Sequence, residues 1–307
     1  MKKIIYLAIL ALGVSFASCD YVQNPYPVKN ANVSYDTASC PTTFAPLTTH
    51  IKKILMEDYT GHTCANCPNA ARSIHIIDST YPGKINVVAI GAGPLAAPTT
   101  AYTTDFRTSV GTLYDNFFGC SNFGLPQGLI NRKNYNATTL THLKAYPYQN
   151  FVNSISGESS VMDLQISHTY DAATRKVYCS IRDSALTAIT GNYRLVALIT
   201  QDSIIDWQDD MAVPPYPGPV QFYVHRHMLR DAITPTGAWG EPLIGGSASP
   251  SLTQIRHFVY TIPVQYFAPG STLHPISCNV NQCHIVAFIY NTVTEEVIQS
   301  EEIKVTP

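Results

Sequence analysis

The sequence predicts an α/β domain followed by an all-β antiparallel sandwich domain, and three observations lead to that prediction. A strand, a helix and a second strand follow one another between residues 52 and 90. A Cys-x-x-Cys pair stands where the first strand runs into the helix. After about residue 160 the pattern changes to repeated strands with turn signals and little helix, which is typical of an antiparallel sandwich.

The first of these patterns predicts a βαβ unit. A strand is expected over 52–59 and ends at Gly61. A helix is expected over 66–79, because apolar residues recur there at helical spacing. A buried type of strand is expected over 85–90. Strand, helix and strand in this order indicate that the two strands are parallel.

Further strands are expected along the rest of the chain. Residues 92–125 look like an insertion of loops with a helix over 105–118, and 129–132 resumes a strand. Six more strands are expected over 161–170, 176–181, 193–200, 258–264, 284–290 and 296–305. Between them, 202–251 is a long proline-containing segment that reads as irregular. A loop of this length is often functional, or it contains minor elements that the sequence does not place.

The N-terminus indicates export. Two lysines precede an apolar run over 4–14, which is the pattern of a secretory signal peptide. The run is shorter than the roughly 20 residues that cross a bilayer. Small residues just before Cys19 resemble a bacterial lipobox, so Cys19 is expected to carry lipid and anchor the chain to a membrane. Ordinary signal cleavage near Ala17 is the alternative.

The expected organisation therefore has four parts: a lipoprotein signal peptide over 1–18, a lipid anchor and tether over 19–46, a first domain over 47–157 and a second over 158–307. Charge is nearly balanced, with 19 Lys and Arg against 21 Asp and Glu. The absence of a basic patch in the sequence argues against nucleic acid as a partner.

Eight cysteines must be allocated in an oxidising compartment. Cys19 is assigned to lipid, and Cys64 and Cys67 form one pair. Cys278 and Cys283 are close enough to bridge a loop as a structural disulfide. The pairing of the other three, Cys40, Cys120 and Cys179, stays open, and at least one thiol is left over.

The Cys64-x-x-Cys67 motif carries the chemistry. The expected helix starts at the motif, and a helix N-terminus offers free N–H groups and a partial positive charge. Both stabilise a thiolate on Cys64. Cys67 lies one turn later on the same face, where it can attack a mixed disulfide formed at Cys64.

The stretch from Asp58 to Pro68 resembles the thioredoxin superfamily. That resemblance implies an α/β thioredoxin-like first domain, in which the insertion at 92–125 separates the motif from Pro126. It implies that Asp58 is a buried carboxylate that helps to deprotonate the second cysteine. It also implies that Pro126 is a cis-proline that faces the cysteines and helps to dock substrate. Thr63 stands where thioredoxins have Trp.

More narrowly, the chain resembles a family of Bacteroidetes outer-membrane lipoproteins, the twenty-eight-kilodalton outer membrane protein family. The resemblance rests on the stretches 57–68, 86–90, 124–132 and 225–230. It implies a lipid-anchored place in the outer membrane, facing the periplasm or the cell surface.

Two functions follow as alternatives. The first is a thiol–disulfide oxidoreductase that acts on exported proteins, with Cys64, Cys67, Asp58 and Pro126 as its catalytic residues. The second is a non-catalytic surface binding or adhesion module, in which the cysteines form only a structural disulfide. No cofactor is expected. No metal is expected either, because no second Cys-x-x-Cys or suitable His pair follows at finger spacing.

Overall fold

The computed structural model describes residues 30–134, 143–144 and 148–306. The predicted signal peptide, Cys19 and the first part of the tether lie outside the described residues. In the described part, no helix is both long and apolar enough to cross a membrane.

Three α-helices and five short or medium strands make up the described residues before 156. In chain order the elements are β1 (Val33–Ser34), β2 (Ile54–Thr60), α2 (Cys67–Thr80), β3 (Ile85–Gly91), η1 (Pro94–Ala96), α3 (Ser109–Phe118), η2 (Cys120–Phe123), β4 (Gln127–Ile130), β5 (Leu143–Lys144) and α4 (Tyr148–Ile155).

Nearly all the regular elements in the remaining described residues are strands. They form β6 (Met162–Asp171), β7 (Lys176–Ala185), β8 (Ile189–Gln201), β9 (Ile204–Asp210), β10 (Gly218–His225), β11 (Met228–Ala232), η3 (Gly237–Trp239), β12 (Glu241–Ala248), β13 (Thr253–Thr261), β14 (Gln265–Tyr266), β15 (Ile276–Ser277), η4 (Val280–Gln282), β16 (Cys283–Asn291) and β17 (Val297–Lys304).

Local sequence explains where the helices begin and end. Pro68 occupies the first turn of α2, where its missing N–H would be unpaired in any case. The Thr108 hydroxyl caps α3 by accepting a hydrogen bond from the Gly111 N–H at 2.9 Å. Gly119 ends α3 in the left-handed conformation at φ 67°, which glycine adopts without steric cost.

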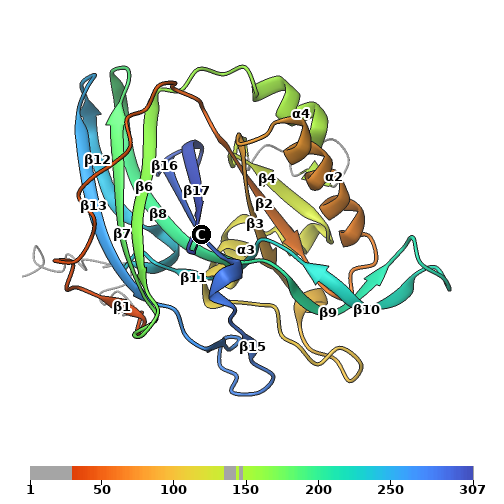
Figure 1. Ribbon diagram of the computed structural model, residues 1–307. Helices are drawn as coiled ribbons and strands as arrows, with labels where there is room; N and C mark the ends of the chain where they lie inside the picture. The colour runs from red at the N-terminus through yellow and green to blue at the C-terminus, as the bar shows by residue number, and fades with distance from the viewer. Residues whose placement is uncertain (1–29, 135–142, 145–147, 307) are drawn as a thin grey trace, which may run out of the picture.

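One nine-stranded sheet forms the centre of the molecule, in the order β17-β16-β8-β11-β3-β2-β4-β5 with β12 also paired to β8. The β2–β3 and β3–β11 pairs are parallel, and the other pairs are antiparallel. Helices α2 and α4 bury their apolar residues on one face of the β2–β3–β4 part, whereas α3 packs on the opposite face (Figure 1).

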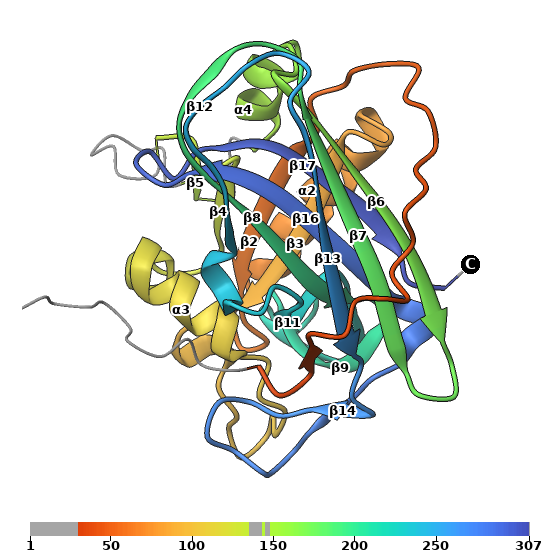
Figure 2. The same cartoon turned by 90° about the vertical axis from the view of Figure 1, so that its left-hand side faces the viewer.

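A second sheet, in the order β1-β13-β7-β6, covers the other end of the central sheet. Its apolar residues share one buried cluster with those of β8 and β16. Figure 2 shows the long strands of this sheet lying over β16 and β17. The helices and the second sheet therefore cover different parts of the same central sheet.

The predicted fold class, an α/β thioredoxin-like domain followed by an all-β antiparallel sandwich, is wrong. β11 pairs with β3 on one side and with β8 on the other, so strands expected in a separate sandwich extend the sheet of the βαβ unit. The molecule is a β-rich fold with several sheets. Local periodicity predicts where strands lie but not which distant strands pair. The exact boundary predicted between residues 157 and 158 stays a prediction.

The local predictions were more accurate. The βαβ unit with its parallel pair is confirmed, as are the helix expected over 105–118 and the six later strands. The segment 202–251 is not an irregular loop. It contains β9, β10, β11, η3 and β12, so the alternative that it holds elements of its own is the one the structure supports. Three of its seven prolines lie in the turn between β9 and β10.

Candidate functional site

A disulfide between Cys64 and Cys67 lies at the start of α2, directly after the turn that follows β2. The two Cα atoms are 5.4 Å apart. Both residues are buried, with exposed fractions of 4% and 2%. When the bond is reduced, the N-terminus of α2 favours a thiolate at this position. The pair therefore has the electrostatic setting for thiol–disulfide exchange, but in this conformation it is covered.

The cover is the β9–β10 hairpin, which is bonded to the backbone of the cysteine loop. The Asp209 N–H donates to the His62 carbonyl, and the Met211 N–H donates to the Ala65 carbonyl, each at 2.8 Å. The Gln208 side-chain amide donates to the carbonyl of Cys64 at 3.1 Å. These bonds tie the hairpin to the loop that holds the disulfide.

An ion pair also ties the hairpin to α2. The Arg72 guanidinium donates to both carboxylate oxygens of Asp210, at 2.8 and 3.1 Å. This hydrogen bonding lowers the pKa of Asp210 below its usual value. The Arg72 side chain is about half exposed, so solvent screens the pair and limits its contribution to stability.

Asp58 is the buried carboxyl of the site. It lies on β2, and its burial raises the pKa to about 7, against a smaller opposite effect of Tyr148. One carboxyl oxygen has no hydrogen-bond partner among the described residues. A carboxyl that titrates near neutral pH is well suited to accept and return a proton.

A glycine makes room for the aromatic ring beside Asp58. Gly128 of β4 lies directly opposite Asp58 in the antiparallel β2–β4 pair. A Cβ atom at Gly128 would meet the Tyr148 ring at 2.6 Å. The glycine thus lets Tyr148 pack closely over the strands, where it helps to exclude water from Asp58.

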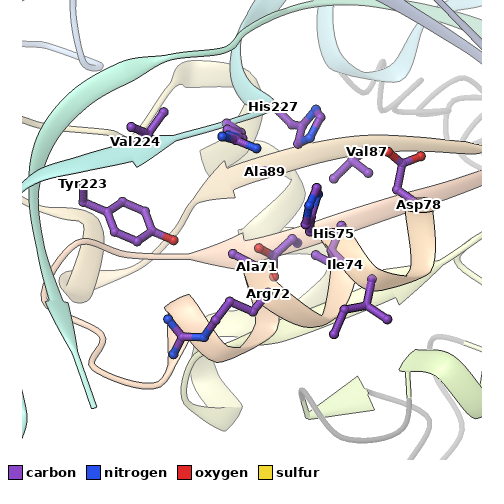
Figure 3. Close-up of a pocket in the computed structure, with 13 residues that line it drawn as sticks. Ala71, Arg72, Ile74, His75, Asp78, Val87, Ala89, Tyr223, Val224 and His227 are labelled. Atoms are coloured by element: carbon purple, nitrogen blue, oxygen red, sulfur yellow. The ribbon is translucent and has the colours of Figure 1, made fainter. Parts of the chain in front are cut away.

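Asp58 also lines a cavity of about 490 Å³ between α2, β3 and β10. Figure 3 shows His75 and Ile74 of α2 on one side of this cavity, with Tyr223 and His227 on the other (Figure 3). The cavity wall is mostly apolar, with charged and aromatic side chains among it. Proton exchange at Asp58 therefore has a route that does not pass the disulfide.

Pro126 lies where the end of β2 meets the start of β4. The register pairs Tyr59 with Gln127, so the residue before Gln127 lies beside the C-terminal end of β2. The Leu125–Pro126 peptide bond is cis. The structure thus gathers the predicted residues Asp58, Cys64, Cys67 and Pro126 around the C-terminal end of one strand.

Two buried histidines pack beside the cysteine loop. His62 bonds through Nε2 to the Ala97 carbonyl at 2.9 Å, and burial lowers its pKa. His225 lies 4.4 Å from the Phe106 ring, measured between ring centroids, and burial lowers its pKa to about 4. The side chains of His225 and His227 lie in different places: His225 packs in this cluster, whereas His227 lines the cavity. Among the described residues, no group of three or more metal-ligating side chains occurs.

The predicted disulfide between Cys278 and Cys283 is not formed. The two Sγ atoms are 3.6 Å apart and both residues are free thiols. Cys278 directly follows β15 and Cys283 opens β16, away from the residues gathered at β2. Cys40, Cys120 and Cys179 are also free and buried.

Three residues that cover or desolvate the motif were not predicted from the sequence, namely Gln208, Asp210 and Tyr148. The sequence of 204–210 has no apolar and polar alternation, and the proline-rich stretch that follows it is the local sign of a turn. No sequence pattern links the hairpin to Cys64, which is more than a hundred residues away in sequence.

Similarity to known proteins identifies the family of this chain. Residues 112–307 match the family described as outer membrane protein Omp28. This match spans more than half of the chain, and the chain belongs to the Omp28 family. The predicted resemblance is confirmed, and the protein is localised to the outer membrane. No curated protein matches the sequence.

Among solved structures, HBP35 of Porphyromonas gingivalis is similar in fold, with a TM-score of 0.55 at 14% identity over 83% of this chain and 76% of that one. A domain of the outer membrane lipoprotein Omp28 from the same organism has 18% identity and a TM-score of 0.31, covering 48% of this chain and 90% of its own. A protein of Agrobacterium tumefaciens has 13% identity and a TM-score of 0.44, covering 84% and 96%.

Proposed function

We propose that this outer-membrane protein carries out thiol–disulfide exchange with cysteines of exported proteins through Cys64 and Cys67. The observation that carries the proposal is the disulfide at the N-terminus of α2, which follows a strand holding a buried carboxyl of pKa about 7. A lipid on Cys19 would hold the protein at the membrane.

The exchange runs in two steps. The Cys64 thiolate attacks one sulfur of a substrate disulfide, and the other substrate sulfur leaves as a thiol. Asp58 then accepts the proton of Cys67, whose sulfur attacks Cys64 and releases the second substrate thiol. The substrate disulfide is reduced and the Cys64–Cys67 disulfide forms. The reverse sequence oxidises two substrate thiols.

Access requires the β9–β10 hairpin to move. Its bonds to His62, Cys64 and Ala65 cover the disulfide, and a substrate protein must displace them. Lids that close over reactive groups commonly move in this way. We propose that the hairpin opens when substrate docks.

Trapping in the producing bacterium tests the proposal. In the full-length Cys67→Ser variant, Cys64 cannot be released and should accumulate mixed disulfides with exported proteins. The Cys64→Ser variant is the matched control and should trap none. The purified wild-type chain should also exchange with a peptide disulfide. Equal trapping by both variants, or no exchange with the peptide, would contradict the proposal.

A non-catalytic binding module is the second candidate, and the exposed side of the hairpin favours it. Phe222 is 74% exposed there, and Ile205 and Tyr216 are exposed on the same hairpin. Exposed apolar side chains that gather in one patch often mark a site of protein interaction. In this case Phe222→Ser should abolish partner capture, whereas the Cys64→Ser variant should retain it. Val293→Ser, at another exposed apolar residue, is the control.

A further inference from the structure

A second pair of cysteines lies close together away from the Cys64–Cys67 site. Cys278 follows β15 and is half-buried, and Cys283 opens β16 and is fully buried. Their sulfur atoms are 3.6 Å apart, which is within hydrogen-bonding distance for thiols. The Cys283 sulfur also lies 3.4 Å from the Asn279 carbonyl oxygen, a second acceptor for its one thiol proton. The outer sulfur is thus reachable, and the inner one lies directly behind it.

Cys278 lines a cavity of about 640 Å³. Gln201, Asp206 and Ile276 line the same cavity, which lies between β9 and the segment around β15. Gln201 holds this segment by donating to the Ser277 carbonyl at 3.0 Å. The cavity offers space for a small molecule or an extended peptide next to the Cys278 sulfur.

A buried cation without a carboxylate partner lies beside the thiols. Arg230 is 4% exposed, and its Nε and Nη1 atoms have no hydrogen-bond partner among the described residues. The guanidinium packs on the Tyr266 ring at 5.0 Å. A buried unpaired charge is costly, so an anion nearby would stabilise it.

The ionisable groups around Arg230 show which side chain can supply the negative charge. The ionisable neighbours that act on Arg230 are Cys278, Cys283, Tyr266 and Tyr260. The nearby carboxylate of Asp231 accepts hydrogen bonds from Tyr260, Asn30 and Asn32 instead. A thiol ionises far more readily than a phenol, which leaves the cysteines as the source of negative charge.

We propose that Cys278 and Cys283 form a second thiol–disulfide exchange centre, in which Cys278 attacks a disulfide-bonded ligand in the cavity and Cys283 resolves the intermediate. This centre is independent of the Cys64–Cys67 pair. The hydrogen bond from Cys283, and then Arg175 and Arg230, lower the pKa of Cys278, while the same hydrogen bond and burial raise the pKa of Cys283. The pKa of Cys278 therefore lies below that of Cys283. This is the order expected if Cys278 is the attacking thiol and Cys283 the resolving thiol.

The reaction balances within the pair and its ligand. The Cys278 thiolate attacks one sulfur of the ligand disulfide, and the other ligand sulfur leaves and takes up a proton. Cys283 then gives up its proton and attacks the Cys278 sulfur, which releases the second ligand thiol. One ligand disulfide is reduced to two thiols, and Cys278 and Cys283 become a disulfide. Arg230 is a positioning residue, because it stabilises the thiolate without meeting the ligand.

Alkylation of the full chain tests the state of the thiols. Iodoacetamide labelling across pH 5–9, read by mass spectrometry, should modify Cys278 at lower pH than the buried Cys40, Cys120 and Cys179. In Arg230→Met the rate at Cys278 near pH 6 should fall about tenfold, the effect of one pKa unit on a thiolate fraction. Arg230→Lys keeps the charge and should restore most of the rate, and Arg182→Met is the remote control.

Oxidised glutathione tests the exchange itself. With the first pair removed by Cys64→Ser and Cys67→Ser, the reduced chain should release two equivalents of glutathione and close the Cys278–Cys283 bond. Adding Cys283→Ser should stop the reaction with glutathione bound to Cys278. If the chain with Cys283→Ser does not fold, the stoichiometry without it and the Arg230 series still decide the matter. An isolated protein whose Cys278–Cys283 bond resists dithiothreitol, or a labelling rate unchanged by Arg230→Met, would overturn the proposal.

Discussion

Asp58 is a residue whose ionisation the fold opposes. Burial raises its pKa to about 7 from 3.8, so the folded state retains a proton that the unfolded chain loses. The resulting stability is fully present below about pH 4 and is lost as pH rises through 7. We expect Asp58→Asn to escape this loss. Relative to wild type, its free energy of unfolding should rise by up to about 4 kcal/mol between pH 4 and pH 8.

Urea unfolding at a series of pH values measures that difference directly. A constant offset between the two proteins would show that Asp58 titrates normally. The same variant should also slow thiol–disulfide exchange at Cys67, and the pH dependence near 7 should disappear from the rate.

His225 has the opposite pH dependence. Its folded pKa of about 4 lies below the ordinary 6.5, so the unfolded chain binds the proton first as pH falls. Its stabilising contribution is complete above about pH 6.5 and declines toward pH 4. We expect His225→Gln to gain up to about 3 kcal/mol on wild type over that interval. Because Asp58 is present in both proteins, the subtraction removes its effect, and parallel stability curves would contradict the prediction.

The placement of single residues was predictable where it depends on one short stretch of sequence. Asp58, Cys64 and Cys67 lie within ten residues, and their spacing relative to a strand and a helix is local information. Their surroundings are not local, because Tyr148 reaches Asp58 from α4 and Gln208 reaches Cys64 from β9. Arg230, the cation beside the second thiol pair, could not be predicted. Its proposed role depends on two guanidinium nitrogens that have no hydrogen-bond partner among the described residues, and the sequence does not show this.

At the scale of elements, the β9–β10 hairpin controls access to the Cys64–Cys67 disulfide. The Arg72–Asp210 pair is half exposed and contributes at most about 1 kcal/mol to its closure. We expect Arg72→Gln to raise the rate of disulfide reduction by dithiothreitol by up to about fivefold, because the hairpin opens more often. Lys53→Gln, which breaks the partly exposed pair with Glu301, is the control.

Hydrogen exchange gives the complementary measurement for that prediction. The amide protons of Asp209 and Met211, which bond to the cysteine loop, should exchange faster in Arg72→Gln. Faster reduction without faster exchange at these amides would mean that the ion pair acts on the disulfide by another route.

The elements themselves were largely predictable, whereas the order of the strands was not. The alternation in 161–170 and the apolar run in 85–90 specify strands from local contacts alone. The pairing of β11 with β3 joins residues 89 and 228 through a single position of register. No local pattern encodes such a pairing, and this is why two separate domains were expected where one sheet continues.

At the scale of the whole molecule, a buried ion pair joins strands and a helix around the centre of the sheet. Arg132 donates to both carboxylate oxygens of Glu57, at 2.6 and 2.8 Å, and both side chains are fully buried. The guanidinium lies 4.7–5.5 Å from four aromatic rings, those of Tyr114, Phe118, Phe288 and Tyr290. These rings come from α3 and β16, so the pair connects the first half of the chain to a strand near its C-terminus.

Breaking this pair from one side should therefore destabilise the entire fold. Glu57→Gln leaves the Arg132 charge buried without its carboxylate, and we expect a loss of about 3–5 kcal/mol in the free energy of unfolding by urea. The double variant Glu57→Gln, Arg132→Met removes both charges and should recover most of that loss, since the aromatic rings can pack on the methionine. If the double variant is no more stable than Glu57→Gln, the loss comes from packing of the carboxylate, and an uncompensated charge does not explain it.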